Sequence, residues 1–149
     1  MKNTWVLVAD SSRARLFVAG SATSALTEFE TLTHMEAKQH ERKITSDLPG
    51  SQAGSDGRHH GMSSETDPKK YEDIEFAKTV SQHLEDARNK HTFNELIVVA
   101  APAFLGLLRE HLTAETLKLI TLEIDKNLTQ HSEEDIRQHL PDRLPGMLS

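Results

Sequence analysis

The sequence contains no cysteine among its 149 residues, which excludes disulfide bonds, thiolate metal sites and cysteine nucleophiles. Aromatic residues are also scarce, at 5% of the chain. Basic residues are fewer than acidic ones, 17 against 23, and the formal net charge is −6. This charge argues against a generally basic surface, so we expect no DNA partner, but a local basic patch remains compatible with the composition.

Long apolar runs are missing as well. The N-terminal apolar run covers only residues 5–9 before Asp10 and Arg13 interrupt it. A signal peptide needs a longer apolar stretch, and a membrane-spanning helix needs about 20 residues. We therefore expect a cytoplasmic protein without a membrane partner. A chain of this length is expected to fold as a single domain, residues 1–149.

Apolar, β-branched runs predict five strands, and apolar positions three to four residues apart predict the helices between them. The strands are predicted at residues 4–9, 14–19, 26–32, 93–101 and 119–124. The helices are predicted at residues 68–90, 103–112, 114–117 and 133–139, with Thr113 and Ser132 as N-terminal caps and Asp135 completing a capping-box-like pair with Ser132.

Three face assignments follow from these periodicities. Alternation predicts that Leu26 and Leu32 share one face of the third strand, and that Ile120, Leu122 and Ile124 share one face of the fifth. The helix after Pro68 is predicted to bury one stripe that consists of Tyr71, Ile74, Ala77, Val80, Leu84 and Ala87.

The order of these elements predicts an α/β fold. The first three strands form an antiparallel meander, and the later strands need crossover helices and therefore pair in parallel. We expect a mixed five-stranded sheet in the order 3-2-1-4-5 with flanking helices, which resembles the ribonuclease-H-like arrangement. The long connection between the third strand and the first helix lies outside this regular pattern.

This connection is a polar stretch from Thr33 to Asp67 that holds four of the seven glycines. Compact domains rarely keep so long a loop unless it is functional or disordered. Arg58, His59 and His60 lie within it and are candidate binding residues. Adjacent histidines are weak candidates for a metal site, because such a site needs three or four convergent ligands. We expect no cofactor and no metal.

Asp10, at the end of the first strand, has two interpretations. It caps the following turn, or it binds a metal as strand-end carboxylates do in ribonuclease-H-like nucleases, with Glu95 and Asp125 as the other acids near strand ends. Capping is the favoured interpretation. Arg13 and Arg15 could contact phosphate, or one of them could pair with Asp10 across the turn, and the pairing is favoured.

The junction between the fourth strand and the following helix is another candidate. Helix N-terminal amides favour anions, and Arg109 lies on the same helix. The alternative, which we favour, is a tight structural junction in which Gly106 permits close packing.

Several stretches together resemble a known family. They are residues 5–17 (WVLVADSSRARLF), 46–50 (SDLPG), 101–109 (APAFLGLLR) and 128–140. They are similar to the bacterial host attachment proteins, described as required for attachment to host cells. That resemblance implies a fold similar to the middle domain of archaeal and eukaryotic class-1 translation release factors.

In those release factors, a loop before a helix carries a Gly-Gly-Gln tip that promotes peptidyl-tRNA hydrolysis on the ribosome. The corresponding connection here contains Gly50-Ser51-Gln52, which makes Gln52 a catalytic candidate by resemblance. The resemblance implies a ribosomal or RNA partner, engaged through residues 33–67.

Three functions therefore stay open. The favoured one is a binding or regulatory module that acts on a ribosome-related or RNA partner. The second is a metal-dependent nuclease or hydrolase that uses Asp10 with the loop histidines. The third is an adaptor that acts indirectly in cell attachment. Of these functions, the sequence favours the non-enzymatic ones. It is also compatible with a homo-oligomer.

Overall fold

The computed structural model describes residues 3–34 and 68–145. Within these residues, five strands form one mixed sheet in the order β3-β2-β1-β4-β5, which confirms the predicted order. β1 pairs antiparallel with β2 and parallel with β4. The strands are β1 (Thr4–Ala9), β2 (Arg13–Ala19), β3 (Leu26–Thr33), β4 (Glu95–Ala100) and β5 (Ile120–Ile124).

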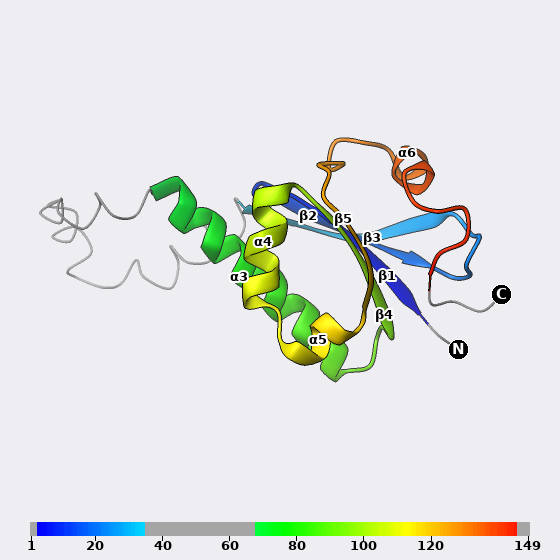
Figure 1. Cartoon of the computed structure of the whole chain (residues 1–149), viewed down its shortest axis with the longest axis horizontal. Coiled ribbons are helices and arrows are strands. Elements are labelled where there is room, and N and C mark those ends of the chain that lie inside the picture. The colour runs from blue at the N-terminus through cyan, green and yellow to red at the C-terminus, as the bar shows by residue number, and fades with distance from the viewer. Residues whose placement is uncertain (1–2, 35–67, 146–149) are drawn as a thin grey trace, which may run out of the picture.

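Helices cover both faces of the sheet (Figure 1). Those on the first face are α3 (Pro68–Asn89), α4 (Pro102–His111) and α5 (Ala114–Lys118). The second face carries α6 (Glu133–Gln138) and the irregular segments around it. Thr113 and Ser132 cap α5 and α6 by accepting hydrogen bonds from the amides of Thr116 and Asp135, as predicted. No helix among the described residues is long and apolar enough to cross a bilayer.

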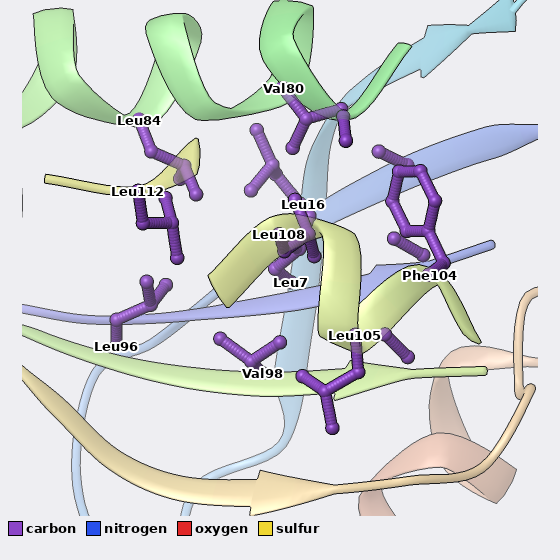
Figure 2. Close-up of a cluster of buried hydrophobic side chains, with 14 of the residues drawn as sticks. Leu7, Leu16, Val80, Leu84, Leu96, Val98, Phe104, Leu105, Leu108 and Leu112 are labelled. Atoms are coloured by element: carbon purple, nitrogen blue, oxygen red, sulfur yellow. The ribbon is translucent and has the colours of Figure 1, made fainter. Parts of the chain in front are cut away.

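Two apolar clusters form the core, one on each face of the sheet. The first core cluster joins β1, β2 and β4 to α3 and α4, and Figure 2 shows Leu108 of α4 between the strands and the α3 side chains. The second core cluster places Leu128, Ile136, Leu140 and Leu144 against the opposite face of the same strands. Because β1 is covered on both faces, all six of its residues are buried. The unbroken apolar run of residues 5–9 is the sequence signature of this double coverage.

Both edge strands contain a bulge, and the predicted face assignments there are wrong. In β3, Leu16 is paired with Glu30 but Phe17 with Glu28, so Phe29 is an extra residue. Leu26 therefore packs in the second core cluster, whereas Leu32 packs against the first. An extra residue shifts the two-residue period and transfers the rest of the strand to the other face.

In β5 the same effect occurs at Thr121. Leu96 is paired with Ile120 and Ile97 with Leu122, so Thr121 is the extra residue. Ile120 packs against the first core cluster, while Leu122 and Ile124 pack against the second. The prediction that these three apolar residues share a face is therefore wrong. Bulges are typical of edge strands, where they discourage pairing with another chain.

The apolar stripe of α3 is confirmed only in part. Ala77, Val80 and Leu84 are buried, but Tyr71 is 54% exposed. Tyr71 lies in the first turns of α3, and the second half of the helix supplies most of its buried contacts with the sheet. Helical spacing alone cannot show where along a long helix the sheet ends.

The C-terminus of α3 is closed by a Schellman motif without glycine. The amide of Thr92 donates to the carbonyl of Ala87, and the amide of His91 donates to the carbonyl of Arg88. His91 has a φ of 57°, in the left-handed region where this motif usually places glycine. A side chain in this region strains the backbone.

We expect His91→Gly to raise the free energy of unfolding by about 1 kcal/mol, since glycine adopts a positive φ without the steric cost. Denaturant unfolding measures the change. His91→Ala is the control, because it removes the imidazole and keeps a Cβ at the strained position. Equal stabilisation by both variants would show that the ring, and not the backbone, is responsible.

A carboxylate on α3 fixes the position of α5. Glu85 accepts hydrogen bonds from the hydroxyls of Thr113 (2.8 Å) and Thr116 (3.0 Å), and it pairs with Arg88 at 2.6 Å. The bonds from Arg88 and then Thr113 lower the pKa of Glu85 from its ordinary 4.5 to about 2. The ionised form is therefore the one that joins the two helices.

We expect Glu85→Gln to lower the melting temperature by several degrees at pH 7. The folded-state pKa lies below the ordinary value, so the stabilisation by Glu85 is complete above about pH 4.5 and is lost as the pH falls toward 2. The difference between wild type and variant should shrink over that interval in thermal melts. Glu110→Gln, at an exposed position on α4, is the control. A difference that stays constant with pH would contradict this linkage.

Candidate functional site at the carboxyl edge of the sheet

The carboxyl ends of β1, β4 and β5 meet at one edge of the sheet because these strands run parallel. Open α/β sheets generally bind ligands at this edge. Here a pocket of about 310 Å³ opens between the turn after β1, the first turn of α4 and the segment after β5. Its lining consists of Asp10, Ser11, Ser12, Asp73, Ala101, Ala103, Phe104, Leu107 and Asn127.

The carboxylate of Asp10 is the central polar group of this edge. One oxygen, Oδ1, accepts hydrogen bonds from the amides of Ser12 (2.8 Å) and Arg13 (3.0 Å). The other, Oδ2, accepts from the Asn127 amide nitrogen (3.0 Å) and the Thr129 hydroxyl (2.8 Å). The predicted turn cap is confirmed, and the same carboxylate also holds the segment after β5.

These contacts keep Asp10 ionised. Burial by itself would raise the pKa of Asp10, but the hydrogen bonds from Thr129, Ser12, Arg13 and Asn127 outweigh it and lower the pKa. A carboxylate that already accepts four hydrogen bonds is a poor base and has little capacity left for a metal. Its chemistry at this edge is that of a structural anchor.

The described residues contain no cluster of three His, Asp or Glu side chains that could hold a metal ion. Glu95 begins β4, where it is paired with Thr4, and therefore lies at the opposite end of the strands from Asp10. Asp125 follows β5 at the same edge as Asp10 and is exposed. Of the acids considered in the sequence, only Asp125 thus lies at the edge of the sheet where Asp10 is found.

Arg15 has a different partner from the predicted one. Its guanidinium forms a two-pronged pair with Glu28 on β3, at 2.8 and 3.1 Å, instead of pairing with Asp10. Its remaining nitrogen donates to the carbonyls of Thr129 (3.0 Å) and His131 (2.6 Å). The prediction of an Asp10 pair is wrong because the turn amides, Asn127 and Thr129 already occupy that carboxylate, and because the Arg15 side chain reaches Glu28 on the neighbouring strand.

Arg13 differs from Arg15. Its amide donates to Asp10, but its guanidinium has no hydrogen bond or ion pair within residues 3–34 and 68–145. The side chain lines a second groove, with Arg15 and the turn at residues 129–132. The structure thus separates two arginines that the sequence presented as equivalent.

The other candidates lie elsewhere. Arg109 on α4 pairs with Glu123 of β5 at 2.9 Å, and its side chain is 60% exposed. Gln52, Arg58, His59 and His60 lie outside the described residues. The roles of Asn127 and Thr129 are not predictable from the sequence, where their signal is only a polar pair shortly after the last predicted strand.

His34 connects the start of the 35–67 segment to this edge. Its amide donates to the carbonyl of Ser12 (2.8 Å), its Nδ1 lies 2.7 Å from the carbonyl of Ser11, and its ring stacks on Phe76 of α3 at 5.3 Å. On the other side of the segment, Asp73 in the first half of α3 lines the pocket. The residues that flank the segment on both sides therefore lie beside the candidate pocket.

We expect Asp10→Asn to lower the free energy of unfolding by about 1–2 kcal/mol, because an amide nitrogen in place of one oxygen leaves the donors that face it, among them the buried Thr129, without an acceptor. Equilibrium unfolding measures the loss. Asp125→Asn is the matched control at a neighbouring strand end, and it should change stability by less than about 0.5 kcal/mol. An equal loss of stability in the two variants would contradict the anchoring role of Asp10.

Comparison with known proteins gives two findings. Residues 5–140 match the model of the family described as "Protein required for attachment to host cells". The chain is also similar to an uncharacterized protein of Rickettsia prowazekii (strain Madrid E), with 37% identity over 75 residues. That alignment covers 49% of this chain and 50% of the relative, so the chain spans about half the length of the curated relative it matches.

The family match extends from β1 to just beyond α6 and includes Asp10, Arg15, Asn127 and Thr129, the residues that join the two ends of the domain. The chain therefore belongs to the family of proteins required for attachment to host cells.

Proposed function

We propose that this protein is a cytoplasmic binding module that engages an RNA-containing partner, the ribosome in the first instance, through residues 33–67. The observation that carries the proposal is the place where this segment is attached. His34 is fixed to the turn after β1, and the first half of α3 lines the pocket at the carboxyl edge. A polar segment attached at the usual ligand-binding edge of an α/β sheet is well placed to contact a partner.

The sheet order supports the same proposal. The order β3-β2-β1-β4-β5 is compatible with the ribonuclease-H-like and release-factor-middle-domain arrangements that the resemblance implies. In release factors the corresponding connection precedes a long helix, as residues 33–67 precede α3 here. The likeness concerns the topological position of the segment. It does not by itself assign peptidyl-tRNA hydrolysis to Gln52.

The chemistry of the described edge favours binding over catalysis. Asp10 is the acid that a nuclease or hydrolase mechanism would use, and its two oxygens already accept four hydrogen bonds. A metal at Asp10 would have to displace Asn127 and Thr129 and so detach the segment after β5. If the partner is ribosomal, the contribution of this protein to host attachment is indirect, through the synthesis of other proteins.

The test is cosedimentation of the full-length protein with ribosomes. We expect the wild type to cosediment at physiological salt and a variant that lacks residues 46–64 to remain in the supernatant. A third form, with residues 46–64 replaced by a glycine–serine sequence of equal length, keeps the attachments at His34 and α3 and should also fail to bind.

Binding of all three forms to the same extent would contradict the role of the segment, and absence of binding by the wild type would contradict the ribosomal partner. Metal analysis of untagged protein tests the enzymatic alternative separately. A stoichiometric metal that is lost in Asp10→Asn would replace the binding proposal with a metal-dependent hydrolase.

A further inference from the structure

A second groove lies on the α6 side of the sheet, next to the carboxyl edge. It has a volume of about 480 Å³ and separates the ends of β2 and β3 from the turn before α6. Its lining consists of Arg13, Arg15, Glu28, Thr31, Thr129, Gln130, His131 and Ser132.

The acidic first turn of α6 lies close to the groove, since Glu133 accepts from the amide of Glu28 at 2.9 Å, so the groove is not generally positive. Two guanidinium groups and one carboxylate line it. Glu28 accepts both prongs of Arg15 and the hydroxyl of Thr31 at 2.7 Å, so its charge is balanced by Arg15. The guanidinium of Arg13 forms no ion pair among the residues that the structure describes.

Further hydrogen-bond donors line the same groove. Ser132 Oγ accepts from the amide of Asp135 at 3.1 Å, which leaves its hydroxyl proton available to another acceptor. Gln130 is exposed, and its side-chain amide has no hydrogen bond within the described ranges. His131 is half-buried, and its Nδ1 lies 3.9 Å from Asp135. The groove therefore combines the guanidinium of Arg13 with neutral donors from Ser132 and Gln130, and its one lining carboxylate is already engaged.

We propose that this groove binds a phosphate group, with Arg13 as the charged ligand and Ser132 and Gln130 as hydrogen-bond donors. A guanidinium presents a planar fork of N–H donors that matches two phosphate oxygens. The assignment of this phosphate to an RNA backbone rests on the proposed function, but the recognition of the anion itself does not.

The groove lies close to Thr33, the first residue of the proposed binding segment. Arg13 is paired with Thr33 at the end of β3, so its side chain lies next to the point where the chain enters residues 35–67. An RNA held by that segment would pass close to Arg13. Phosphate contacts of this kind position a nucleic acid without reading its sequence.

The test is a titration of the ¹⁵N-labelled full-length protein with inorganic phosphate at constant ionic strength, with chloride as the reference anion. We expect shifts of the Arg13 side-chain Nε–H and of the backbone amides of Gln130 and Ser132. Arg13→Gln should weaken phosphate binding about tenfold, since it removes a charge-assisted pair of hydrogen bonds.

Arg13→Lys keeps the charge and should restore part of the affinity. Arg109→Gln is the matched control, because Arg109 is exposed and pairs with Glu123 away from the groove. It should leave phosphate binding unchanged. A thermal melt of each variant shows whether the fold is intact. Gln130→Ala is a second test, because this exposed substitution should weaken phosphate binding and leave the melting temperature unchanged. Phosphate binding that is absent in the wild type, or equally reduced by Arg13→Gln and Arg109→Gln, would overturn the proposal.

Cosedimentation of Arg13→Gln with ribosomes separates this proposal from the proposed function. Loss of phosphate binding together with weaker cosedimentation supports both. Loss of phosphate binding with unchanged cosedimentation overturns the assignment to RNA and leaves the ribosomal proposal standing. A wild type that binds phosphate at Arg13 but no ribosome overturns the ribosomal proposal and leaves the anion site standing.

Discussion

The hydrogen bonds to Asp10 hold together two parts of the chain that are far apart in sequence. Its carboxylate joins the turn after β1 to Asn127 and Thr129, more than 110 positions away. The layer on the second face depends on that connection, because α6, the helix that the described residues place there, has six residues and would not be stable in isolation. Arg15 strengthens the same connection through the carbonyls of Thr129 and His131.

The far end of this layer is held in the same way. Arg137 donates to the carbonyls of Ala22, Ser24, Pro141 and Asp142 and so ties α6 to the β2–β3 turn. Glu133 accepts from the amide of Glu28 on the edge strand. The driving force comes from burial of Ile136 and its apolar neighbours, about 1.5–3 kcal/mol for each large side chain. The polar anchors add little net energy beyond this, but they decide where the layer lies on the sheet.

Sequence predicted the features that depend on local chemistry. Thr113 and Ser132 cap helices through their own backbone neighbours, and the antiparallel meander followed by crossover helices predicts the sheet order. The bulges at Phe29 and Thr121 could not be predicted, because the extra residue is defined only by its partner strand. For the same reason Asp10 was recognised as a turn cap, while its bonds to Asn127 and Thr129 were not.

The anchoring roles also decide which residues are available for function. Asp10 and Arg15 carry the charges that first suggest a site, yet both have their hydrogen-bonding capacity filled by the chain itself. Arg13 has the same charge as Arg15 but lies two residues closer to the turn, where it is paired with Thr33; Arg15 is paired with Thr31, and its guanidinium reaches Glu28. A difference of two positions along one strand therefore separates a structural arginine from one whose guanidinium has no hydrogen-bond partner among residues 3–34 and 68–145.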